Sequence, residues 1–179
     1  MKSLEEKTLS STPAYQGKLV NLHVDTVLLP NGTQSIREIV RHPGAVAMVP
    51  VLPSGDVVLV RQFRHAARQV LLEIPAGTLE PGEDPVIAAR RELQEEIGYK
   101  PGTLAPLGGE YTAPGYTTEY IHLYLATDLS ESHLTQDDDE FLEVVTLPFD
   151  DALREVLSGS ITDGKTQLGL LLAAHHLER

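Results

Sequence analysis

A helix with an acidic face is predicted over residues 85–97, and the rest of the chain has to accommodate its charge. Asp84 is a favourable N-cap residue, and Pro85 suits the first helical position. No glycine or proline interrupts the segment up to Ile97, and Gly98 stands where a helix commonly ends. The sequence therefore defines both ends of this helix.

The two sides of the predicted helix differ in character, because residues three and four apart share a face. The acidic side holds Glu92, Glu95 and Glu96, and Glu83 lies in the loop just before the helix. The apolar stripe comprises Val86, Ala89, Leu93 and Ile97. We expect the apolar stripe to pack on a core and the acidic side to perform another task.

The acidic side needs a compensating charge, because like charges at this spacing destabilise a helix by roughly 0.2–0.5 kcal/mol per pair. Arg91 can pair with Glu95 one turn later, and Arg90 is nearby, but two arginines against four carboxylates leave an excess of acid. A hard divalent cation such as Mg²⁺ or Mn²⁺ would fit, since it prefers oxygen ligands and commonly joins carboxylates to substrate phosphates. The alternative is a solvated acidic face, which is the commoner outcome for an isolated run of this kind.

The complete pattern decides between these alternatives. The chain has Gly77, five residues, Glu83, seven residues, Arg91-Glu92-Leu93, one residue, Glu95-Glu96, one residue and Gly98. This arrangement resembles the Nudix box at every fixed position, and only Tyr99 departs from it, where the family usually has an aliphatic residue. The resemblance implies a Nudix hydrolase, which uses metals to cleave a nucleoside diphosphate linked to another moiety.

The resemblance also implies roles for individual residues. The metal ligands would be Glu92, Glu95 and Glu96, with Glu83 either ligating or orienting and the backbone carbonyl of Ala76 as a further ligand. Arg91 would fix Glu83 or Glu95 in place. The metals would lower the pKa of a water, and a separate carboxylate would take its proton.

Composition limits the class of protein. The chain has 179 residues, 41% of them apolar, which suits one globular fold with a real core. A net charge of −12 argues against nucleic acid or an anionic membrane as partner, and the lack of cysteine excludes disulfides and thiol chemistry. The first ten residues do not resemble a signal peptide, and no apolar run has membrane-spanning length. We expect a cytoplasmic enzyme.

The N-terminal part is predicted to form a hairpin. Residues 1–12 are polar and are expected to be loose. Alternating apolar residues from 19 to 29, the turn Pro30-Asn31-Gly32 and a return strand over 35–41 predict two paired strands. We divide the chain into an N-terminal arm (1–42) and a catalytic domain (43–179). By resemblance to nucleotide-sugar Nudix enzymes, the arm would reach a second subunit in a homodimer.

A central hairpin is predicted next, from residues 45–52 and 57–63 around a Pro-Ser-Gly-Asp turn. Arg61 and Arg64 end it, and on a straight strand they would point to opposite faces, so a shared phosphate site would need a bend between them. Charges at a fraying strand end are an equally good interpretation of the spacing. The segment looks like the one that supplies substrate-binding arginines in ADP-ribose pyrophosphatases, and Arg37-Glu38 looks like another such pair.

Two segments after the box narrow the function further. Strands are predicted over 104–110 and 119–126, and Pro114 between them could belong to an ordinary turn. However, it follows Gly98 at the spacing of the marker proline of the ADP-ribose pyrophosphatase subgroup. The acidic stretch beyond residue 128 is mostly a solvated loop by composition, but the subgroup draws its general base from this region. We choose Glu140, with Asp139 and Glu143 as rivals.

A second motif near the C-terminus points to a different class of protein. Residues 159–166 match the P-loop pattern G-x-x-x-x-G-K-[ST]. A true P-loop follows a strand and opens the helix of a βαβ unit. Here a helix is predicted over 152–157, Gly159 ends it, Asp163 caps a last helix, and no strand can follow. We therefore interpret the match as coincidental.

The sequence thus predicts an α/β Nudix fold, with a mixed sheet between helices and an antiparallel N-terminal sheet. The predicted activity is Mg²⁺-dependent hydrolysis of ADP-ribose or a related ADP-sugar to AMP and ribose 5-phosphate. The alternatives are a pyrophosphatase for GDP-mannose or a dinucleoside polyphosphate, a module that only senses ADP-ribose, and, least favoured, a P-loop nucleotidase.

Overall fold

The computed structural model describes residues 3–135 and 141–178. The chain divides into two compact units: Met1–Gly44 with Tyr111–Tyr120, and Ala45–Glu110 with Ile121–Arg179. We call them unit 1 and unit 2 and describe each by itself.

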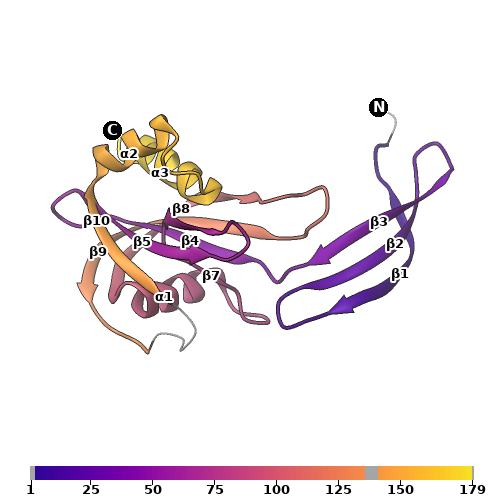
Figure 1. Cartoon of the computed structure of the whole chain (residues 1–179), viewed down its shortest axis with the longest axis horizontal. Coiled ribbons are helices and arrows are strands. Elements are labelled where there is room, and N and C mark those ends of the chain that lie inside the picture. Colours follow the sequence, from indigo (N-terminus) through magenta and orange to yellow (C-terminus); the bar gives the residue numbers. More distant parts are fainter. Residues whose placement is uncertain (1–2, 136–140, 179) are drawn as a thin grey trace. The chain divides into compact units, whose positions relative to one another are not determined.

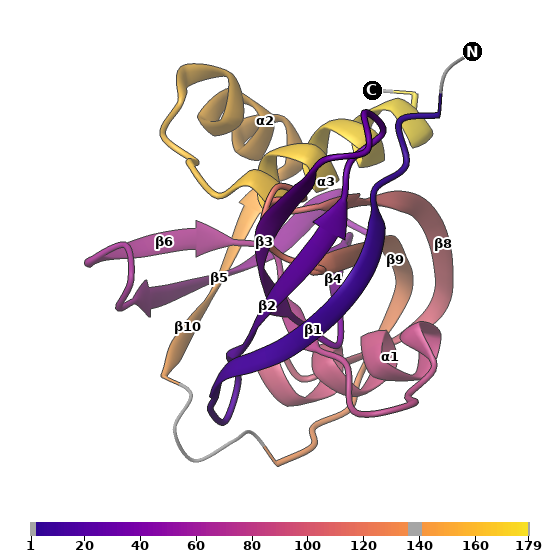
Figure 2. The same cartoon turned by 90° about the vertical axis from the view of Figure 1, so that its right-hand side faces the viewer.

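Unit 1 contains a three-stranded antiparallel sheet in the order β1-β2-β3 (Figures 1 and 2). The strands are β1 (Lys7–Gln16), β2 (Asn21–Leu28) and β3 (Gln34–Arg41). The predicted hairpin of β2 and β3 is confirmed; in its turn Gly32 has a φ of +85° and the Asn31 side chain accepts from the Thr33 N–H.

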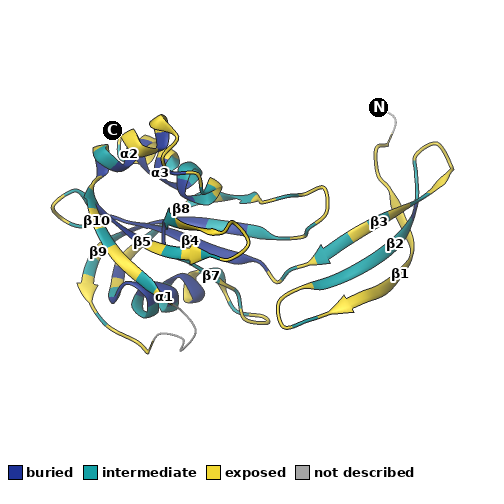
Figure 3. Ribbon diagram, in the orientation of Figure 1, coloured by how far each residue is buried: buried dark blue, intermediate teal, exposed yellow. Residues whose placement is uncertain are grey.

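The expectation that residues 1–12 are loose is wrong for residues 7–12, because β1 begins at Lys7. All of its residues are exposed, so no alternation of buried and exposed side chains marks the strand (Figure 3). Backbone pairing with β2 holds it instead, from Lys7 opposite Leu28 to Gln16 opposite Asn21. Unit 1 also includes the segment 111–120, tied to β3 by hydrogen bonds on both sides of Val40.

Unit 2 contains two sheets. One has the order β7-β4-β9-β8, with β4 parallel to β9 and antiparallel to β7. Its strands are β4 (Ala45–Pro50), β7 (Ala76–Thr78), β8 (Tyr99–Tyr111) and β9 (Tyr120–Glu131). The other has the order β10-β5-β6, formed by β5 (Asp56–Arg64), β6 (Gln69–Glu73) and β10 (Leu142–Pro148).

Helices cover both faces of the first sheet. Val46 and Met48 of β4 pack in one core cluster with α1 (Pro85–Glu96), whereas Ala47 and Val49 pack in another with α2 (Phe149–Ser158) and α3 (Gly164–His176). Because successive side chains of a strand point to opposite faces, β4 is covered on both sides. Figure 1 places α1 across the sheet from α2 and α3. The predicted mixed sheet between helices is confirmed.

The predicted central hairpin is wrong in its pairing. The turn is present, with the Leu52 N–H donating to the Asp56 carbonyl and Gly55 at a φ of +88°. Only Val51 and Val57 form a bridge, and then β4 and β5 enter different sheets. Both strands are apolar on both faces, a pattern that indicates burial but does not identify the neighbouring strand.

The helix ends agree with the prediction. The Asp84 side chain accepts from the Val86 and Ile87 N–H groups at the start of α1, and Gly98 follows its end with a φ of +71°. Asp163 caps α3, and Gly159 ends α2 in the left-handed conformation. Over the described part of the chain, no helix is long and apolar enough to cross a membrane.

Candidate active site

Two glutamates of α1 are buried although they are charged. The exposed fractions of Glu92 and Glu96 are 8% and 6%. They lie on the side of α1 that meets β7, where the Ala76 N–H donates to Glu96 Oε2 over 3.0 Å. The apolar stripe, in contrast, begins later than predicted, because Val86 is 39% exposed while Ala88, Ala89 and Leu93 are buried. The acidic side of α1 therefore faces the protein, which argues against a merely solvated surface.

Gly77 of β7 makes room for this arrangement. A Cβ atom at position 77 would lie 1.9 Å from Cδ of Glu92 and 2.0 Å from Oε1. No side chain can be accommodated at these distances while Glu92 keeps its position. The fixed glycine at the start of the box thus has a physical reason, since it lets the carboxylate of Glu92 rest directly against the backbone of β7.

Arg91 binds three glutamates at once. Its Nε and Nη2 atoms donate to the two oxygens of Glu83 over 3.1 and 3.0 Å, and Nη1 donates to Glu92 over 2.7 Å and to Glu95 over 2.8 Å. The expected pairing of Arg91 with Glu95 is present, and the pairing with Glu83 is bidentate. Arg91 thereby neutralises part of the charge that the sequence left unbalanced.

The electrostatics of this cluster favour the ionised form of Glu83. The hydrogen bonds from Arg91 hold the pKa of Glu83 below its usual value, more than offsetting the opposing effect of burial, and the Glu80 N–H also donates to Glu83. The pKa of Arg91 is raised above its already high value, first by its hydrogen bonds to Glu83. Glu83 therefore stays ionised at neutral pH, and Arg91 holds it together with Glu92 and Glu95 in an arrangement suited to bind a cation.

The donor set fits a divalent cation of the Mg²⁺ type. All candidate donors are oxygens, and the carboxylates of Glu92 and Glu96 are held beside the backbone of β7. Among the residues described, no three acidic or histidine side chains already converge as a complete cage. A Mg²⁺ site does not need one, since it usually combines one or two carboxylates with waters and substrate phosphates.

The two arginines of β5 have different partners. Arg61 lies 3.4 Å from Glu143 of β10, and both side chains are exposed. Arg64 forms two 2.7 Å hydrogen bonds with Glu73 of β6. Because β5 lies between β10 and β6, the two guanidinium groups engage opposite neighbours. The structure therefore does not bring Arg61 and Arg64 to a common partner among the described residues.

The remaining predicted substrate residues lie in unit 1. Arg37 and Glu38 are adjacent on β3, so their side chains point to opposite faces, and Arg37 binds Glu6 through two hydrogen bonds of 2.9 and 2.6 Å. Pro114 lies in the segment between β8 and β9.

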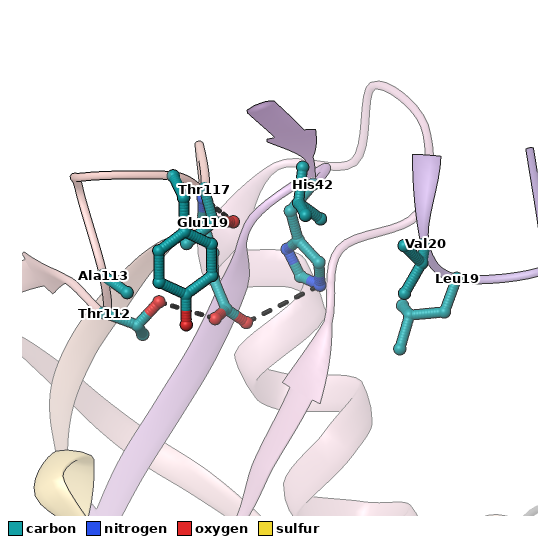
Figure 4. Close-up of a pocket in the computed structure, with 9 residues that line it drawn as sticks. Leu19, Val20, His42, Thr112, Ala113, Thr117 and Glu119 are labelled. Carbon is teal, nitrogen blue, oxygen red and sulfur yellow. Dashed lines mark hydrogen bonds and ion pairs between the residues drawn. The ribbon is translucent and has the colours of Figure 1, made fainter. Parts of the chain in front are cut away.

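The same unit contains a pocket of about 500 Å³ (Figure 4). Its lining includes the apolar Leu19, Val20 and Val40 and the polar His42, Thr112 and Glu119. Glu119 accepts from the Thr112 hydroxyl over 2.7 Å and lies 3.6 Å from His42 Nε2. Pro114 is not among the lining residues.

Of the three candidates for the general base, Glu143 lies among the described residues. Glu140 and Asp139 fall outside the described residues. Glu143 is on β10, exposed and paired with Arg61.

Sequence reasoning missed one charged group of this region, Glu73. It is completely buried at the end of β6 and binds Arg64 and Lys165. The signal was a single acid within the apolar stretch 70–74, since a buried acid requires cationic partners. Lys165 comes from the P-loop match, which here joins α2 to α3 and does not follow a strand.

Comparisons with known proteins agree with this geometry. A family model described as a NUDIX domain matches residues 41–165, and one described as a nucleoside diphosphate sugar hydrolase N-terminal domain matches residues 6–40. The ADP-ribose pyrophosphatase of Bacillus subtilis (strain 168) is 46% identical over 168 residues, which cover 93% of this chain and 91% of that protein.

Other relatives carry different names. The methanol dehydrogenase activator of Bacillus methanolicus is 44% identical, with 94% of this chain and 92% of that protein covered. The GDP-mannose pyrophosphatase of Yersinia enterocolitica serotype O:8 is 38% identical, with 82% of each chain covered. A solved structure, described as an ADP compounds hydrolase, has a TM-score of 0.88 at 25% identity and covers 99% of this chain and 97% of that one.

Proposed function

Because this chain belongs to the NUDIX domain family, we propose that it hydrolyses the diphosphate bond of ADP-ribose or a related ADP-sugar, giving AMP and ribose 5-phosphate from ADP-ribose. The observation that carries the proposal is the buried pair Glu92 and Glu96: the absence of a side chain at Gly77 lets Glu92 rest against β7, and Glu96 accepts from the Ala76 N–H of the same strand. A protein that only sensed the ligand would have no need to keep every box glutamate.

Nudix hydrolases generally use a divalent metal, and we propose Mg²⁺, with Mn²⁺ as a substitute. The residues that would hold it are Glu92, Glu95 and Glu96, with Glu83 and the carbonyl of Ala76 as further donors. The cation would supply charge neutralisation at the diphosphate and acidify a water.

Arg91 has a positioning role in this proposal. It reaches Glu83, Glu92 and Glu95 simultaneously, so it fixes the relative orientation of carboxylates that would otherwise repel one another. Removing such a supporting group typically costs roughly 10- to 100-fold in metal affinity or activity.

Glu140 is our choice for the general base, with Asp139 and Glu143 as alternatives and Glu95 if none of these serves. A carboxylate engaged with a cation has its lone pairs occupied, so an acid from the segment after β9 is better able to accept the proton. Glu140→Gln should lower kcat with little change in KM, because the lost interaction exists mainly in the transition state. Full activity of Glu140→Gln, with loss in Asp139→Asn or Glu143→Gln, would move the assignment to that residue.

We assign substrate contacts to the arginines, since guanidinium groups bind phosphates well. Arg64 uses Nε and Nη2 for Glu73, which leaves Nη1 for an anion. Arg61, Arg37, Glu38 and Pro114 complete the proposed substrate set.

Two further properties belong to the same proposal. The three-stranded sheet of unit 1, whose strand β1 is exposed along its whole length, lies largely within the match to the N-terminal family model and is the proposed contact in a homodimer. We also propose that the enzyme acts in the cytoplasm on a small nucleoside diphosphate sugar, without nucleic acid or membrane as partner.

The test is product analysis with a panel of ADP-ribose, other ADP-sugars, GDP-mannose and a dinucleoside polyphosphate, each with Mg²⁺ or with excess EDTA. We expect the highest kcat/KM for ADP-ribose, AMP and ribose 5-phosphate as products, and no turnover in EDTA. A preference for GDP-mannose, as the name of the Yersinia relative suggests for that protein, would replace the substrate but retain the reaction. Tight binding of ADP-ribose without turnover would favour a sensing module.

A further inference from the structure

A buried ion cluster lies beside the candidate active site in unit 2. At its centre is Glu73, whose side chain has no measurable exposure. Arg64 donates to both of its oxygens over 2.7 Å, and the ammonium group of Lys165 contacts Oε2. The two cations together offset the cost of burying the Glu73 carboxylate.

The first turn of α3 holds Lys165 in place. Asp163 Oδ2 accepts from Lys165 Nζ over 2.9 Å, from the Thr166 N–H over 3.0 Å and from the Thr166 hydroxyl over 2.5 Å. The Thr166 oxygen in turn accepts from the Ile74 N–H over 2.9 Å. The end of β6 is therefore fixed to α3 through a side chain at Glu73 and through the backbone at Ile74.

The charges of this cluster balance. Glu73 and Asp163 are acidic, and Arg64 and Lys165 are basic. Burial alone would raise the pKa of Glu73, but the hydrogen bond from Arg64 and the charge of Lys165 outweigh it, so the pKa lies below its usual value. The pKa of Arg64 is raised, first by its hydrogen bond to Glu73, and the charge of Glu96 in the candidate metal site contributes as well. Arg64 is thus electrostatically coupled to both clusters.

We propose that Lys165 is a positioning residue for Arg64: by sharing the Glu73 carboxylate, it keeps the Arg64 guanidinium fixed, so that Nη1 can bind the substrate diphosphate. Nη1 makes no hydrogen bond or ion pair within the described part of the protein. Without Lys165, two acids would face one base, and Arg64 would be drawn further onto them, so that the orientation of Nη1 would be lost. This inference rests on the substrate role assigned to Arg64 above.

The G-x-x-x-x-G-K-T segment then has a function in this chain that does not involve a bound ATP phosphate. Its lysine contacts the Glu73 carboxylate, and its threonine accepts from the N–H of Ile74, the residue that follows β6. Both side chains are used inside unit 2, and Thr166 is completely buried. The segment thus supports the candidate active site by holding Glu73 and Ile74 in place.

The first test compares Lys165→Met with Lys100→Met, which removes an exposed lysine from β8 of the same unit. Methionine keeps most of the aliphatic stem and removes the charge. We expect KM for ADP-ribose to rise about tenfold in Lys165→Met, the lower end of the range for outer-shell partners. We expect kcat to stay within about twofold in both variants, and KM to be unchanged in Lys100→Met. An unchanged KM in Lys165→Met would overturn the inference.

The second test repeats Lys165→Met in an Arg64→Met background. If Lys165 acts through Arg64, the additional substitution should change KM by less than about twofold. A further tenfold rise would mean that Lys165 acts on the substrate by another route, and the inference would be rejected. If Arg64→Met alone leaves KM unchanged, the inference falls together with the role of Arg64, whereas hydrolysis of ADP-ribose by the unmodified enzyme would still stand.

Lys165→Met removes one of the two cationic partners of the buried Glu73 and could therefore misfold. A background in which Glu73 itself is neutral avoids this problem. In Glu73→Gln the link between Lys165 and Arg64 no longer carries charge. KM of Glu73→Gln with Lys165→Met should therefore equal KM of Glu73→Gln alone. A tenfold difference between these two variants would contradict the proposed route, and circular dichroism would establish that both are folded.

Discussion

Replacing Arg91 by methionine tests whether the carboxylates of the site are held together by this one side chain. The variant loses a bidentate pair with Glu83 and single hydrogen bonds to Glu92 and Glu95. A hydrogen bond to a charged group contributes roughly 1.5–3 kcal/mol, and breaking a buried pair costs about 3–5 kcal/mol. Because Arg91 is partly exposed and these contributions are not additive, we expect a loss of about 3 kcal/mol.

Thermal unfolding measures this loss directly. For a chain of this size, 1 kcal/mol corresponds to roughly 2–4 °C in Tm, so Arg91→Met in EDTA should melt about 6–12 °C below the unmodified protein. Added Mg²⁺ should narrow the difference in Tm, because a bound cation neutralises the same carboxylates that lose their partner in Arg91→Met.

Arg154→Met is the matched control, since Arg154 is 70% exposed and forms a surface pair with Asp151. Such pairs contribute about 0–1 kcal/mol, so its Tm should fall by no more than about 4 °C. If Arg91→Met melts no lower than Arg154→Met in EDTA, Arg91 does not hold the site together, and the reasoning is refuted.

Three further predictions concern the same site. Glu92→Gln and Glu96→Gln should each lower kcat by more than the roughly 10- to 100-fold typical of an outer-shell partner, while the circular dichroism spectrum stays unchanged. Steady-state kinetics at saturating Mg²⁺ measure this effect, and near-normal turnover of either variant would contradict the prediction. Gly77→Ala should lower kcat as severely as Glu92→Gln, because a Cβ would lie 1.9 Å from Cδ of Glu92, and a normal rate would show that Glu92 can move without consequence. The pKa of Glu83 is lowered from 4.5, so its stabilising contribution is complete above that pH and is lost as the pH falls through the folded-state pKa. The Tm of Glu83→Gln should therefore fall less between pH 6 and pH 3 than the Tm of the unmodified protein, and an equal fall in both proteins would contradict this.

Local signals predicted the elements whose structure is determined by neighbouring residues. The cap at Asp84, the glycine at position 98 and the spacing of the glutamates defined α1 and its acidic side. The turn at Gly32 likewise predicted the pairing of β2 with β3. In each case, the residues that specify the structure lie within a few positions of one another, which is what a sequence pattern can detect.

The elements that depend on distant partners were missed or mispaired. β1 is exposed along its whole length, so its hydrogen bonds to β2 leave no trace in the pattern of apolar residues. β4 was expected beside β5, but it lies between β7 and β9, because an apolar strand reveals its burial and not its neighbour. The same limit applies to Glu73, whose need for cations was visible although its partner Lys165, far along the chain, was not.

The short segment from Ile74 to Ala76 explains why the last helix matters to a site built mainly by α1. Three consecutive residues use their backbone on three different elements: the Ile74 N–H donates to Thr166 of α3, the Pro75 carbonyl accepts from Met48 of β4, and the Ala76 N–H donates to Glu96 of α1. Each of these groups would be costly to leave unpaired in the interior, by about 1–3 kcal/mol. The position of Glu96 is therefore set jointly by α1 and, through the backbone of this segment, by α3. Removing the Thr166 hydroxyl, which contacts this segment directly, should consequently affect the carboxylates of the box, whereas Lys165→Met leaves this backbone link intact.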